Sequence, residues 1–83
     1  MEQAIIEVSS ACATLANRKV SGTIQQHERK DLTITSREAI PVLAEVKVQS
    51  EGLLFLGEVQ ECILDSEANW RIQIRLRRTL LVV

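Results

Sequence analysis

The sequence predicts an all-β fold, a small antiparallel β-barrel of about five to seven short strands. Apolar and polar residues alternate with a period of two in several segments, which is typical of half-buried strands. Turn-forming residues separate these segments at the short spacing found in small barrels and sandwiches. With 83 residues the chain is long enough for one domain, so we interpret residues 1–83 as a single barrel domain.

The clearest strand signal follows Pro41, where apolar and polar positions alternate over residues 42–49. Gly52 can then adopt a positive φ in a tight turn, and residues 53–64 return as a second strand. This pattern predicts a hairpin over 42–64 that turns at Glu51-Gly52. Gly57, inside the returning strand, predicts a bulge or a bend.

The last strand is predicted over residues 70–78, because apolar residues at even positions alternate with arginine and glutamine. Trp70 is expected to fill the core at its start. Two shorter strands are predicted near residues 20–25 and 32–35, joined by a polar connection over 26–31.

The N-terminal segment fits two interpretations. Ile5, Val8, Cys12 and Leu15 have the spacing of one helix face, whereas the β-branched and Ser/Thr content favours strands. We favour a strand over residues 11–16, followed by a turn at residues 17–19.

Composition narrows the classes of function. Ten Lys and Arg against eleven Asp and Glu give a net charge of −1, so binding to nucleic acid would require a local basic patch. Trp70 and Phe55 are the only aromatic residues, which disfavours stacking on bases. No signal peptide or bilayer-spanning apolar run is recognisable, so a cytoplasmic location is expected, with no membrane association.

No motif predicts catalysis, a metal site or a cofactor, and we therefore expect a protein that is not an enzyme. His27 has no neighbouring nucleophile and is interpreted as a solvated loop residue. Glu58 and Glu61 are interpreted as surface charges. Cys12 and Cys62 fit no metal or redox spacing and are interpreted as buried thiols.

The last strand contains the one concentrated group of basic residues. Arg71, Arg75 and Arg77 are predicted to share a strand face, with Arg78 adjoining them. They are candidates for a surface that binds an anion or a partner. Alternatively, they form a solvated face and pair with glutamates such as Glu58 on the neighbouring strand.

The chain ends in four apolar residues, which are Leu80, Leu81, Val82 and Val83. This segment either continues the last strand and packs within the domain, or forms an edge that pairs with another chain. The second alternative makes these residues candidates for a homodimer interface.

From Ile24 to Leu80 the order of features resembles the PilZ domain, a small bacterial β-barrel that in many members binds cyclic diguanylate. The likeness lies in residues 40–48, in Leu54-Phe55-Leu56-Gly57-Glu58-Val59, and in the final strand. The resemblance implies a barrel fold and a regulatory or adaptor role through protein–protein contact. The alternative is binding of nucleic acid or another anion on the Arg71, Arg75 and Arg77 face.

The resemblance does not extend to the nucleotide motifs. PilZ domains that bind the nucleotide typically carry R-x-x-x-R and D/N-x-S-x-x-G, and the second should fall on residues 26–31. There Gln26, Glu28 and Asp31 replace the Asp or Asn, the Ser and the Gly. No arginine lies four residues before Arg18. Because paired guanidinium groups are missing and acidic residues repel phosphate, we expect no cyclic diguanylate binding.

Overall fold

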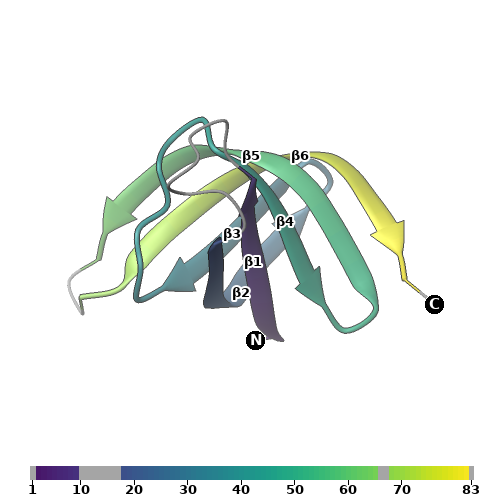
Figure 1. Cartoon of the computed structure of the whole chain (residues 1–83), viewed down its shortest axis with the longest axis horizontal. Helices are drawn as coiled ribbons and strands as arrows, with labels where there is room; N and C mark the ends of the chain where they lie inside the picture. The colour runs from purple at the N-terminus through teal and green to yellow at the C-terminus, as the bar shows by residue number, and fades with distance from the viewer. Residues whose placement is uncertain (1, 10–17, 66–67, 83) are drawn as a thin grey trace.

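Six antiparallel strands close into a β-barrel in the computed structural model, which describes residues 2–9, 18–65 and 68–82. The order around the barrel is β1-β2-β3-β6-β5-β4, and β1 closes the ring by pairing with both β2 and β4 (Figure 1). The described residues contain no helix, so the predicted all-β barrel is confirmed. The strands are β1 (Glu2–Ser9), β2 (Arg18–Glu28), β3 (Asp31–Ser36), β4 (Glu45–Ser50), β5 (Leu53–Leu64) and β6 (Trp70–Leu81).

Aliphatic side chains from every strand fill the barrel, because alternate residues of each strand point inward. Ile40, in the connection between β3 and β4, is fully buried and adds a core side chain from outside the strands. The buried apolar residues are Ala4, Ile6, Val8, Val20, Ile24, Leu32, Ile34, Ile40, Val46, Val48, Phe55, Val59, Ile72, Ile74 and Leu76.

Two buried serines connect neighbouring strands through their hydroxyl groups. Ser36 Oγ of β3 donates to the carbonyl of Ser21 on β2 at 2.8 Å, and Ser50 Oγ of β4 donates to the carbonyl of Gln3 on β1 at 2.8 Å. Since a buried hydroxyl without a partner is costly, both contacts keep polar groups satisfied at the barrel wall.

The predicted hairpin turn is present between β4 and β5. Glu51 has a φ of 41° and Gly52 a φ of 81°, the two positive values of a type I′ turn. The first strand of this hairpin was predicted to start too early. Residues 41–44 form a turn instead, in which Leu43 has a φ of 73°. Strand β4 therefore begins at Glu45 rather than at Val42.

The N-terminal residues 2–9 form a strand rather than a helix. Ala4, Ile6 and Val8 point inward with a period of two, and Ile5 is 47% exposed. The predicted strand over residues 11–16 lies outside the described residues. The predicted turn at residues 17–19 was wrong for Arg18 and Lys19, because both belong to β2, which begins at Arg18.

The connection predicted over residues 26–31 is shorter than expected. Strand β2 continues to Glu28, and Arg29 and Lys30 alone separate it from β3. His27 is therefore a strand residue, whose ring meets that of Phe55 edge to face with centroids 4.8 Å apart. The strand continues because its polar end pairs with β3 beyond a bulge at Gln25.

The long pair of β5 and β6 contains two bulges, which bend it over the barrel (Figure 1). Arg77 is the extra residue of β6, opposite the step from Leu56 to Gly57, and Gln60 is the extra residue of β5. A Cβ atom on Gly57 would collide with the carbonyl oxygen of Arg75. The bulge predicted near Gly57 is present, but its extra residue belongs to the partner strand.

Two residues expected in the core are only half buried. Trp70 and Cys62 pack against the core from one end of the β5–β6 pair, where each lies near a strand terminus. Cys12 lies outside the described residues.

Gly57→Ala should destabilise the barrel because β6 leaves no room for a methyl group at this position. We expect a loss of about 2 kcal/mol, as for other overpacked sites, and a melting temperature lower by roughly 8–16 °C. The control is Gly52→Asn, since a Cβ at Gly52 would make only an ordinary contact, 3.7 Å from the Val82 carbonyl oxygen, and asparagine tolerates a positive φ. A Gly57→Ala protein that melts like the wild type would contradict the close approach of the two strands.

Candidate functional site

The arginines of β6 lie on the outer surface, but they do not form a free basic stripe. Arg77 pairs with Glu45 at 2.8 Å and with Glu58 at 3.4 Å, and Arg75 Nε lies 3.7 Å from Asp31. Arg71 has no ion-pair partner among the described residues. The positive charge on this face is therefore largely compensated at the positions of Arg75 and Arg77.

The bulge at Gln60 places Glu58 and Glu61 on the same outer face, although their spacing would separate them in a regular strand. Glu58 lies opposite Arg75, and Glu61 lies opposite Gln73. Because Glu58 also pairs with Arg77, it acts as part of a surface charge network. Cross-strand pairing of the arginines with Glu58 is one of the arrangements expected from the sequence.

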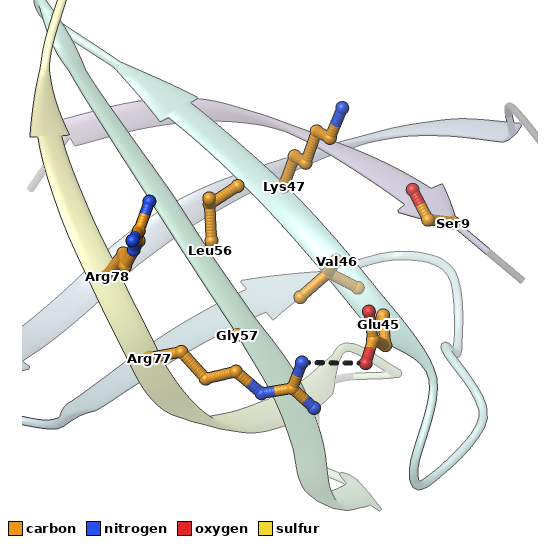
Figure 2. A pocket seen from close by; sticks show the side chains of 8 residues that line it. All are labelled: Ser9, Glu45, Val46, Lys47, Leu56, Gly57, Arg77 and Arg78. Atoms are coloured by element: carbon orange, nitrogen blue, oxygen red, sulfur yellow. Dashed lines mark ion pairs between the residues drawn. The ribbon is translucent and has the colours of Figure 1, made fainter.

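A pocket of about 310 Å³ opens on the outer face of the sheet (Figure 2). Its lining comes from four strands, which bring together residues distant in sequence. Basic, acidic and apolar groups are all present. The lining residues are Ser9, Glu45, Val46, Lys47, Leu56, Gly57, Arg77 and Arg78.

The floor of this outer pocket is a row of three neighbouring residues. Lys47 of β4 lies opposite Leu56 of β5, which lies opposite Arg78 of β6. Figure 2 shows the Leu56 side chain between the two basic side chains. Neither Lys47 nor Arg78 has an ion-pair partner among the described residues. The pocket can thus accept acidic groups on both sides of an apolar one.

The region that would correspond to a nucleotide motif is occupied by contacts within the chain. Arg18 forms an ion pair with Glu38 at 3.1 Å, and Gln26 Nε2 donates to Glu28 at 2.5 Å. Asp31 is the partner of Arg75. The side chains of Arg18 and Gln26 therefore already interact with carboxylates of the chain itself.

The apolar C-terminal residues extend β6 to the periphery of the molecule (Figure 1). Leu80 and Leu81 lie opposite Leu54 and Leu53 of β5, and the Val82 N–H donates to the Gly52 carbonyl at 2.7 Å. All three remain exposed, by 40% at Leu80, 77% at Leu81 and 44% at Val82. Val83 lies outside the described residues.

Sequence reasoning missed Lys47 and Leu56 as site residues. In the sequence, Lys47 fits the alternation as an ordinary outward-facing polar residue, and Leu56 fits it as an ordinary apolar residue of a strand. Their closeness to Arg78 follows from the register of β4, β5 and β6. The adjoining basic residue Arg78 was the only signal that the sequence offered.

The fold and surface define a small closed antiparallel barrel with a mixed-charge pocket on its outer face. The described residues contain no cluster of His, Cys, Asp or Glu suited to a metal ion. Among them there is also no helix long and apolar enough to cross a membrane. Comparisons with protein-family models, with curated proteins and with solved structures gave no match.

The Arg77 ion pairs should contribute little to stability, because the Arg77 and Glu45 side chains are each 55% exposed. We expect Arg77→Ala to change the free energy of unfolding by about 0–1 kcal/mol in a chemical denaturation experiment. Ile72→Ala, in the core of the same strand, should cost about 2–5 kcal/mol. Comparable losses in the two variants would contradict a surface role for Arg77.

Proposed function

We propose that this protein is a non-enzymatic, PilZ-like regulatory or adaptor domain that acts in the cytoplasm by contact with a protein partner. The outer pocket carries the proposal, because Lys47 and Arg78 lie on either side of Leu56 and neither has an ion-pair partner in the part of the chain that the structure describes. The occupant that fits best is a partner segment with an apolar side chain flanked by acidic residues. It would place the apolar group on Leu56 and its carboxylates on the two cations.

The spacing of the pocket supports an extended protein segment. Lys47 and Arg78 lie on strands separated by one other strand, so their backbones are about 10 Å apart. On one face of an extended segment, acidic side chains two positions before and two positions after an apolar residue stand about 13 Å apart. The long, flexible side chains of Lys47 and Arg78 can span the difference.

Binding of nucleic acid or another anion on the Arg71, Arg75 and Arg77 face has less support. Two of these arginines already have carboxylate partners, which an incoming phosphate would have to displace. The pocket also presents no aromatic ring, and stacking on rings is a main source of affinity for single strands.

The PilZ resemblance is consistent with this function without implying a nucleotide. A closed barrel of antiparallel strands agrees with what the resemblance implies about the fold. Arg18 is engaged by Glu38, and Glu28 and Asp31 add negative charge to the β2–β3 end. A bis-phosphate would find no paired guanidinium groups there.

Isothermal titration should detect no binding of cyclic diguanylate at micromolar concentrations. Guanidinium forks of the required kind are missing, and nearby carboxylates repel phosphate. Arg18→Ala serves as the comparison, since Arg18 is the upstream arginine. An exothermic isotherm with the wild type that disappears in Arg18→Ala would restore a nucleotide-sensing role.

A photoreactive amino acid in place of Leu56 should cross-link a protein in cells of the source organism. The same group in place of Arg71 is the matched control, because Arg71 is exposed and lies on β6 away from the pocket. The partner identified should bind the purified barrel more weakly as salt increases, since exposed charges are screened.

With that purified partner, Lys47→Glu combined with Arg78→Glu should weaken binding by at least about tenfold, which corresponds to about 1.4 kcal/mol. Arg71→Glu should leave the affinity within about twofold. Equal cross-linking at positions 56 and 71, or equal effects of the charge reversals, would exclude the pocket as the binding site.

A further inference from the structure

The strand ends that extend beyond a neighbouring strand of the described barrel include the C-terminal end of β2, the C-terminal end of β5 and the C-terminal end of β6. Strand β2 loses its β1 neighbour after Ile24, and β5 loses its β4 side after Val59. Strand β6 pairs with β3 only as far as Arg75, and the Leu76 N–H makes the last contact, to Lys30. Beyond that point β6 pairs with β5 alone among residues 2–9, 18–65 and 68–82.

The open edge of β6 carries backbone groups available for another strand. The Val82 N–H donates towards β5. Because N–H groups alternate between the two edges of an antiparallel strand, those of Thr79 and Leu81 point to the open edge. Their carbonyls point the same way, so the edge offers two donors and two acceptors.

This open edge lacks the features that protect the C-terminal ends of β2 and β5 from pairing with another strand. The β2 end carries a bulge at Gln25 and a charge at Glu28, and the β5 end carries a bulge at Gln60 and a charge at Glu61. Such features discourage pairing with another chain. From Thr79 to Val82 the β6 edge has no charge and no proline.

We propose that the open edge of β6 pairs antiparallel with the same edge of a second copy, about a two-fold axis at Leu80. Opposite residues of an antiparallel pair lie on the same face of the sheet, and neighbouring residues of one strand lie on opposite faces. In a symmetric pair, one residue must therefore lie directly opposite the same residue of the second copy, and the two-fold axis passes between them. With Leu80 there, Thr79 lies opposite Leu81 of the other copy. Those two residues exchange the free backbone hydrogen bonds, which gives four across the interface.

The side chains suit this register. On the outer face Leu80 meets its own copy, and Arg78 lies opposite the uncharged Val82 of the second chain. The two Arg78 residues are then four positions apart, about 13 Å along the strand, which exceeds the screening length of about 8–10 Å at physiological salt. The register therefore joins apolar groups without opposing like charges.

The dimer would extend the outer sheet across both barrels. Arg78 lines the outer pocket and lies on the strand that forms the interface. The two pockets would consequently face the same side of one continuous sheet. This inference does not depend on the proposed protein partner, because it rests on the β6 edge alone.

Sedimentation velocity over about 10 µM to 1 mM tests the association. The full chain should approach about twice its mass of 9.3 kDa as concentration rises. Thr79→Pro should remain monomeric with an unchanged circular dichroism spectrum, because it removes a donor that points away from β5. Thr79→Val should still dimerise. A wild-type monomer at 1 mM, or a dimer that survives Thr79→Pro, would overturn the proposal.

Disulfide cross-linking tests the register in a Cys12→Ser, Cys62→Ser background. Leu80→Cys should form a dimer rapidly, because opposite residues of a non-hydrogen-bonded pair have Cα atoms about 4.5 Å apart. Leu81→Cys should cross-link at least about tenfold more slowly, although Leu81 is the more exposed of the two. Random collision predicts the reverse order, and faster cross-linking at position 81 would exclude the two-fold axis at Leu80.

Discussion

The pairing of β1 with both β2 and β4 is the constraint on which the structure depends. It closes the sheet, so that inward residues of all strands share one apolar interior. The hydrogen bond from Ser50 to Gln3 lies at this β1–β4 contact. An open sheet of this length would leave two exposed edges and an uncovered apolar face. After closure, the described strands lack a neighbour on one side only where their ends extend beyond the adjacent strand.

The bulge at Arg77 determines which basic side chains lie on the outer surface of the barrel. In a regular strand, consecutive arginines at 77 and 78 would point to opposite faces, and one of them would enter the core. Burial of an unpaired charge is costly, so the extra residue relieves a conflict between sequence and fold. Both arginines are exposed, and Arg77 reaches Glu45 while Arg78 borders Leu56. Gly57 makes this arrangement possible, because β6 passes too close for a side chain.

The two surfaces of interest both belong to the β5–β6 pair. The outer pocket uses the face of these strands, and the open edge uses the backbone of β6 beyond its contact with β3. The pocket offers charged and apolar side chains, and the edge offers backbone N–H and carbonyl groups. The described residues bring together no metal-binding cluster. A barrel of this size has little interior to spare for a ligand, so recognition is expected on its outside. The length of β5 and β6 supplies that surface.

The sequence by itself determined the strand class, the turn at Glu51-Gly52 and the inward residues of β6, because alternation and positive φ depend on adjacent residues. It could not determine that β2 runs to Glu28, since the polar end of that strand is held by pairing with β3. The neighbours of Arg77, and the row formed by Lys47, Leu56 and Arg78, depend on register and bulges. Those are set by contacts between distant segments, and only the tertiary structure decided them.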